Sequence, residues 1–182
     1  MNDVIYYDKT DAFKLEKLVS YFFIYSFFGW VFEELIFILF YNDFVFRGFL
    51  YLPILPIYGF GAVIISSIFP DSKFEVVSIF IISFIICSLF EYISSYLLES
   101  IFNISLWDYY DLKYNLNGRV SLISSIYFSI ACVLIVKVFN PIFERKLKKY
   151  RNNLGLEIFL SVLIIVSFID FCLSCFKYLN KF

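Results

Sequence analysis

Long apolar runs alternate with short polar connections along the whole chain. The first run, residues 18–41, covers about two dozen residues, the length at which an α-helix crosses a hydrocarbon core of about 30 Å. Soluble core helices do not need that length of phenylalanine, leucine and isoleucine. The pattern returns in further stretches at residues 49–69, 75–102, 119–139 and 154–176. We therefore predict an all-α polytopic membrane protein with about five transmembrane helices.

Pro53 and Pro56 interrupt the second of these runs. Proline removes a backbone donor and kinks or breaks a helix, so we expect this helix to be kinked and to begin irregularly. Non-helical backbone at membrane depth is tolerated only where protein or a water-filled cavity covers it. At the two ends, we expect residues 1–17 to form a cytoplasmic segment and residues 177–182 to form a tail.

The composition agrees with this class and excludes several functions. The chain is 62% hydrophobic and only 17% charged, which excludes an ordinary soluble domain. Its formal net charge of −1 does not favour a nucleic-acid partner. Histidine is absent from the sequence, so His-ligated zinc and Ser-His or Cys-His catalysis are excluded, and we predict no catalytic residue, metal or cofactor. Cys172 and Cys175 form a C-x-x-C inside a predicted spanning helix, where small packing residues are the favoured interpretation.

Lysine and arginine are distributed unevenly between the two sides of the predicted membrane domain. Nine lie on the N-terminal side and five on the other: Lys9, Lys14, Lys17, Lys73, Arg145, Lys146, Lys148, Lys149 and Arg151 against Arg47, Lys113, Arg119, Lys177 and Lys181. Basic residues concentrate in cytoplasmic connections, so this asymmetry predicts N-in/C-out orientation in the cytoplasmic membrane. Lys137 falls between the two sets, near the inner end of the fourth predicted helix, and is expected to extend to the headgroups.

Carboxylates inside the predicted helices are the first sign of a functional site. Each costs about 2.5–3.5 kcal/mol on membrane-insertion scales, so it needs a partner or a use. At 1.5 Å per residue, Glu33 and Glu91 lie roughly 22 and 24 Å from the inner ends of their helices, in the outer half of the membrane. Arg47 and Arg119 enter from outer connections. We predict that Glu33 and Glu91 pair with these arginines, whose planar guanidinium groups hold two carboxylate oxygens while remaining charged.

Neighbouring residues extend this predicted site. Glu99 lies on the same helical face as Glu91, eight residues further along. Trp107, Tyr109 and Tyr110 fit an interfacial lid or aromatic belt over the site. Asp170, in the last predicted helix, also falls in the outer half.

Several short motifs of the chain are similar to those of a known family. They are Gly29-Trp30-Val31-Phe32-Glu33, Arg47-Gly48-Phe49-Leu50-Tyr51, Pro53 with Pro56-Ile57-Tyr58-Gly59-Phe60-Gly61, Glu91-Tyr92 with Tyr96 and Glu99, Trp107-Asp108-Tyr109, and Asn115-Leu116-Asn117-Gly118-Arg119. Together they resemble the bacterial family of putative ABC-transporter permeases of type IV (CmpB-like), over roughly the first four predicted helices. Phe46, Leu52 and Tyr127 depart from the family pattern, which has Asn, Gly and Trp there. The resemblance implies membrane location and transport, and the candidates for the polar site are Glu33, Arg47, Glu91, Glu99, Trp107, Asp108, Asn117 and Arg119.

Three functional hypotheses fit these residues. In the first, the chain is a transporter or permease component; since it contains no G-x-x-x-x-G-K-[ST], an ATP-driven version needs a separate ATPase subunit, and a homodimer is the other expected partner. The basic run at 145–151 could dock that ATPase. The favoured interpretation is that this run sets the orientation of the chain in the membrane and also touches anionic lipid. In the second, Glu33 and Glu91 act as acid and base of a membrane-embedded enzyme. In the third, the charged set only locks the helices together.

Overall fold

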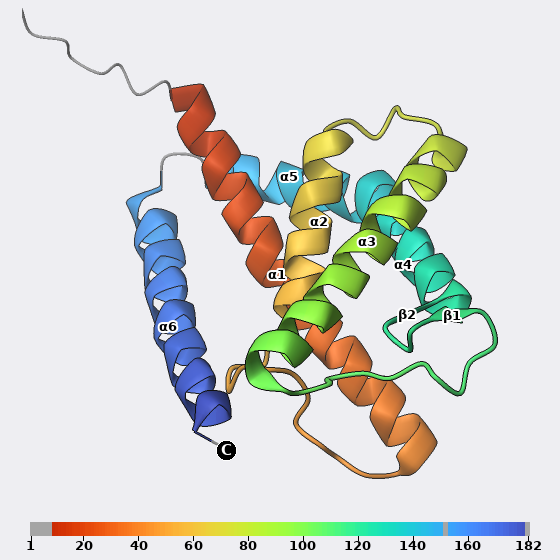
Figure 1. Ribbon diagram of the computed structural model, residues 1–182. Helices are drawn as coiled ribbons and strands as arrows, with labels where there is room; N and C mark the ends of the chain where they lie inside the picture. Colours follow the sequence, from red (N-terminus) through yellow and green to blue (C-terminus); the bar gives the residue numbers. More distant parts are fainter. Residues whose placement is uncertain (1–8, 151–152, 181–182) are drawn as a thin grey trace, which may run out of the picture.

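The computed structural model describes residues 9–150 and 153–180 of the chain. Nearly all of the described elements are helices (Figure 1). They are α1 (Lys9–Tyr41), α2 (Pro56–Ile68), α3 (Val76–Phe102), the short strands β1 (Asn115–Leu116) and β2 (Val120–Ser121), α4 (Leu122–Leu134), a π-helical segment (Ile135–Phe139), α5 (Asn140–Lys148) and α6 (Leu154–Leu179).

The prediction of an all-α polytopic membrane protein is confirmed. Within the described residues, four helical stretches are long and apolar enough to cross a membrane, and α2 is a shorter apolar helix. The four are Phe13–Tyr41, Val76–Phe102, Leu122–Lys148 and Leu154–Leu179. Most of their surface is exposed in the isolated chain, as expected for helices whose outer faces meet lipid.

Several helix boundaries differ from those that hydropathy suggested. α1 begins at Lys9 instead of residue 18, because a helix can continue beyond the bilayer into the polar residues that flank its apolar run. α2 begins at Pro56, whose fixed φ and missing N–H suit the first helical turn, so residues 49–55 are not helical. α6 continues to Leu179, into the stretch expected to be a tail.

The fourth helical stretch differs most from the expectation. It begins at Leu122, because residues 119–121 belong to the β-hairpin, and it does not end near Pro141. Instead the π-helical segment Ile135–Phe139 leads directly into α5, and Pro141 lies in the first turn of α5. Lys137, in the π-helical segment, donates to the backbone carbonyls of Ser72 and Phe74 in the α2–α3 turn, where we expected it to reach the headgroups.

Helices pair where small residues let their backbones approach. α1 packs on α2, where a Cβ on Gly59 would lie 2.7 Å from the Phe22 carbonyl oxygen of α1. α3 packs on α4, and the Ser88 and Ser125 hydroxyls hydrogen-bond across this contact at 2.7 Å. The core between α2, α3 and α4 contains Ile65, Phe69, Ile79, Cys87, Cys132 and Val136. Close backbone contact therefore replaces the large apolar core of a soluble protein.

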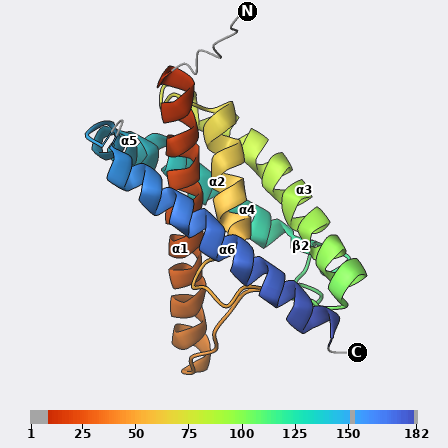
Figure 2. The ribbon, with the colours of Figure 1, turned by 90° about the vertical axis from the view of Figure 1, so that its left-hand side faces the viewer.

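The two ends of the bundle carry different elements. The connection 42–55 lies at the same end as the β-hairpin and the C-terminal end of α6, whereas α5 and the α2–α3 turn lie toward the other end (Figure 1). α6 crosses the outside of α1 and α2 as a peripheral helix (Figure 2). The connections that carry Arg47 and Arg119 are thus brought to one end, which is the end where the candidate site lies.

Candidate functional site

Glu33, in the second half of α1, is the centre of a polar cluster between α1, α2 and the connection 42–55. Its Oε2 lies 3.3 Å from Arg47 Nη1, and its Oε1 accepts a hydrogen bond of 2.6 Å from the Tyr58 hydroxyl. The Arg47 guanidinium also lies 4.7 Å above the ring of Phe37. Both side chains of the ion pair remain about one-third exposed, at 33% for Glu33 and 35% for Arg47. The predicted Glu33–Arg47 pair is therefore present and accessible from one side.

Glu34 is the buried neighbour of this cluster. Its Oε1 accepts the backbone N–H of Arg47 at 2.8 Å, which fixes the place where the chain turns back. Gly48 follows with φ +111°, a backbone conformation that suits glycine. Glu34 is only 3% exposed, and its Oε2 has no hydrogen-bond partner within the described residues. A buried carboxylate oxygen without a donor is costly, so this half of the cluster is short of positive charge.

Glu91, on α3, does not pair with an arginine. It is 2% exposed, and it accepts hydrogen bonds from the Tyr109 hydroxyl at 2.9 Å and from Ser124 Oγ at 3.1 Å. Ser124 is held in place by a capping box with Ser121 at the start of α4. The predicted Glu91–Arg119 pair is wrong, because the hydroxyls of Tyr109 and Ser124 are the hydrogen-bond partners of this carboxylate.

Arg119 instead forms an ion pair with Glu99, one helical turn beyond Ser95 on α3. Its Nη1 donates to Ser95 Oγ at 3.3 Å, and its guanidinium lies 5.9 and 5.5 Å from the rings of Tyr92 and Tyr96. The cause is local backbone geometry: Asn117 and Gly118 both have positive φ and close the β-hairpin. The hairpin directs Arg119 toward the end of α3, away from Glu91.

The other candidates from the connection 103–121 shape that connection. Trp107 Nε1 donates to the Arg119 carbonyl at 2.9 Å, Asp108 accepts the Tyr110 N–H at 2.8 Å, and Asn117 donates to the Tyr92 hydroxyl at 3.1 Å. Tyr109 is the residue of this connection that reaches the buried carboxylate.

A small cavity lies between Glu91 and Tyr58, the residue that donates to Glu33. It lies between α2, α3 and α4, has a volume of about 40 Å³, and its lining includes Tyr58, Phe90, Glu91 and Phe128. That volume is enough for one or two water molecules. Burial raises the pKa of Tyr109 well above its usual value, and the charges of Glu91 and Glu33 raise it further. Tyr109 therefore stays protonated and donates a hydrogen bond to Glu91, and it lies close enough to Glu33 for the charge of that carboxylate to raise its pKa as well.

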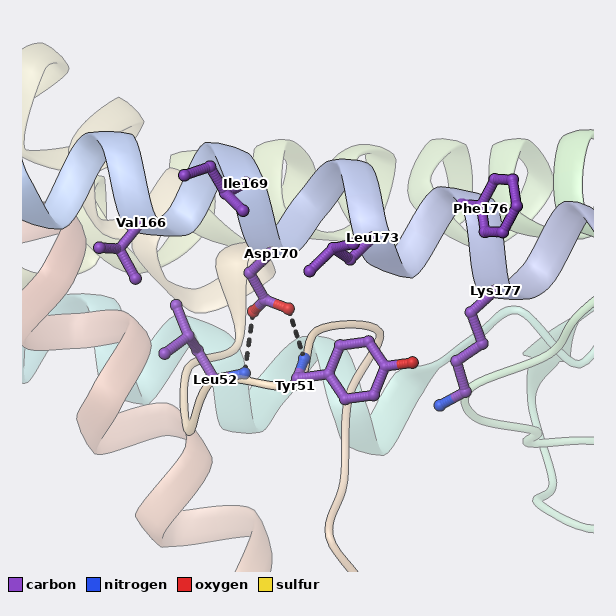
Figure 3. Close-up of a pocket in the computed structure, with 8 residues that line it drawn as sticks. All are labelled: Tyr51, Leu52, Val166, Ile169, Asp170, Leu173, Phe176 and Lys177. Atoms are coloured by element: carbon purple, nitrogen blue, oxygen red, sulfur yellow. Dashed lines mark hydrogen bonds between the residues drawn. The ribbon is translucent and has the colours of Figure 1, made fainter.

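Asp170, on α6, is a buried carboxylate that the candidate set did not include. Its two oxygens accept the backbone N–H groups of Tyr51 and Leu52 at 3.0 and 2.8 Å (Figure 3). These donors lie in the non-helical stretch before Pro53, where α-helical hydrogen bonds are missing. The acid inside an apolar run was visible in the sequence, but its partners are backbone groups, which residue types do not reveal. Beside it, an open groove of about 660 Å³ runs between α6 and Tyr51 toward Lys177.

A family model described as "Putative ABC-transporter type IV" matches residues 20–175 of the chain, which includes most of α6 with Asp170 as well as the motifs of the first four predicted helices. Neither the curated proteins nor the solved structures give a match.

Proposed function

Since the chain belongs to the family described as "Putative ABC-transporter type IV", we propose that it is the transmembrane component of a transporter and that the Glu33–Glu91 region contacts the substrate. The single observation that carries this proposal is that a small cavity is lined both by Glu91 of α3 and by Tyr58, whose hydroxyl donates to Glu33 of α1. Ionisable groups inside a membrane are costly, and they commonly mark substrate or ion pathways. With the N-terminus inside, the site lies in the outer half of the membrane.

The charge balance of the site favours a cationic substrate. Glu33, Glu34 and Glu91 contribute three carboxylates, whereas Arg47 is the only guanidinium in contact with any of them within the described residues. Arg119 is engaged by Glu99. The aromatic rings of Tyr58, Phe90 and Phe128 around the cavity add surfaces that attract cations. A small organic cation would supply the missing positive charge at the accessible side of Glu33, since the cavity itself has room for only one or two water molecules.

An ATP-driven cycle requires a partner, because the chain has no phosphate-binding loop of its own. We propose a separate ATPase subunit, with a second copy of the chain as the alternative partner. Purification in mild detergent tests this directly: a nucleotide-binding ATPase should be recovered with the chain. Recovery of no ATPase, together with uptake that is unaffected by ATP depletion, would remove the ATP-driven version.

Substitution of Glu33 distinguishes a role in transport from a role that only holds the helices together. In proteoliposomes containing the purified complex and ATP, Glu33→Gln should abolish uptake of small organic cations such as choline or putrescine while leaving the yield unchanged. Glu157→Gln is the matched control, because Glu157 is an exposed acid in the first turn of α6. If Glu33→Gln lowers yield and melting temperature but the folded fraction transports normally, Glu33 only locks the helices. Uptake of anions in preference to cations would refute the cationic substrate.

A further inference from the structure

α5 changes direction relative to the helix that precedes it. α4 passes into the π-helical segment Ile135–Phe139, and Pro141 follows in the first turn of α5. π-Helical turns and prolines are two established causes of helix kinks. In both views α5 runs across α1 instead of alongside it (Figures 1 and 2). Lys137, in the π-helical segment, is bound to the α2–α3 turn, so α5 begins at that end of the bundle.

Asn140 holds the start of α5 against two other helices. Its Oδ1 accepts from the Tyr25 hydroxyl at 2.7 Å, its carbonyl accepts from the Tyr21 hydroxyl at 3.2 Å, and its Nδ2 donates to Ser66 Oγ at 2.8 Å. Phe143, one turn on, packs with its ring 5.9 Å from that of Tyr25. The inner face of α5 is therefore occupied by α1 and α2, and the direction of the helix is fixed.

The outer face of α5 is strongly basic. The exposed charged residues of the helix are Arg145, Lys146 and Lys148, and Lys149 follows directly at its end. Glu144 is the acid among them, and it pairs with Lys148 at 3.1 Å and with Lys17 of α1 at 3.6 Å. In the stretches 9–150 and 153–180, no ion pair involves Arg145, Lys146 or Lys149. Three cationic groups are thus available to an external anion.

We propose that α5 is a surface helix that binds the headgroups of anionic phospholipids. It forms the last nine residues of the long helical stretch 122–148, lies across the bundle after the π-helical segment and directs its free cations outward, which is the arrangement that attracts anionic lipid. Arginine and lysine both bind phosphate oxygens through charge-assisted hydrogen bonds. Phospholipid is favoured over a protein partner because the apolar residues Phe143 and Leu147 are already packed inside the chain. The exposed residues of α5 are then its cations and the apolar Ile142, a combination that suits the surface of an anionic membrane.

The test titrates the purified chain, in neutral detergent, with phosphatidylglycerol and with phosphatidylcholine, and measures bound lipid by native mass spectrometry. Wild type should retain phosphatidylglycerol and release phosphatidylcholine. The variant R145Q/K146Q/K148Q/K149Q should bind phosphatidylglycerol several-hundred-fold more weakly, at about fivefold per lost charge. Glu144→Gln should strengthen binding, because it releases Lys17 and Lys148 from their acidic partner. The control K113Q/K177Q, which removes basic residues at the other end of the bundle, should bind like wild type.

Two results would overturn the proposal: unchanged phosphatidylglycerol binding by the quadruple variant, and binding of phosphatidylcholine by the wild type that is as tight as its binding of phosphatidylglycerol. If the quadruple variant keeps its lipid binding but loses a co-purifying ATPase, α5 is assigned to a protein partner instead. Because Glu144→Gln is expected to act in the opposite direction, a general loss of folding cannot imitate the predicted pattern.

Discussion

Replacing Asp170 by alanine removes the group that holds α6 against the non-helical stretch before Pro53. Asp170 is 6% exposed, and its oxygens accept the N–H groups of Tyr51 and Leu52 at 3.0 and 2.8 Å. Alanine leaves these two backbone donors at membrane depth without their acceptor.

The size of the effect follows from these two bonds. A hydrogen bond to a charged group contributes about 1.5–3 kcal/mol, so at the lower value the pair contributes about 3 kcal/mol. For a chain of this length, about 2–4 °C of melting temperature corresponds to each kcal/mol, so Asp170→Ala should melt about 6–12 °C below wild type. Asp170→Asn should fall between the two, because an amide oxygen still accepts one N–H but its NH₂ group opposes the other.

The assay is thermal unfolding of the detergent-purified chain, followed by tryptophan fluorescence. Ile165→Ala is the control, since Ile165 lies on the same helix and is 58% exposed; its loss should change stability by no more than about 0.5 kcal/mol. If Asp170→Ala melts with the wild type, or if Ile165→Ala falls as far, the carboxylate does not hold this stretch and the reasoning is refuted.

Other predictions concern packing, titration and the start of α5. Gly59→Ala should destabilise by about 1–3 kcal/mol because a Cβ there meets the backbone of α1, whereas Gly61→Ala, which meets nothing within 4 Å, should be neutral or slightly stabilising in the same melting assay. The raised pKa of Tyr109 means that its neutral form is the one favoured by folding. The stability that the Tyr109 hydroxyl contributes to the folded state is complete below the unfolded pKa of about 10 and is lost as pH rises beyond it. The melting temperature of Tyr109→Phe should therefore fall less steeply at alkaline pH than that of wild type. An equally steep fall would contradict this. Asn140→Ala removes an acceptor and a donor from buried partners and should cost about 2 kcal/mol, and melting within error of the wild type would contradict the role of Asn140 as the anchor of α5.

Residue types and spacing predicted part of the candidate site. Glu33 and Arg47 are 14 positions apart and are joined by a single connection at the end of α1, so the chain itself brings them near each other. Glu91 and Arg119 are separated by a longer connection that folds into a hairpin, and the position of Arg119 depends on the left-handed turn at Asn117 and Gly118. A count of charges in each half of the membrane cannot decide which donor fills the space beside a carboxylate. For this reason the sequence predicts only a place in a lid or aromatic belt for Tyr109, whereas in the structure its hydroxyl is the direct partner of Glu91.

Hydrophobic length along the chain, by itself, determined that this protein is a helical membrane protein and roughly where its helices lie, because the bilayer acts on each apolar run separately. Tertiary structure decided what the costly polar groups do there. It gave Asp170 two backbone N–H groups as partners, carried the helix past Pro141 into α5, and moved Arg119 to Glu99. These outcomes depend on angles at a few turns and on which donor lies within about 3 Å of an acceptor, and such distances exist only once the helices have packed.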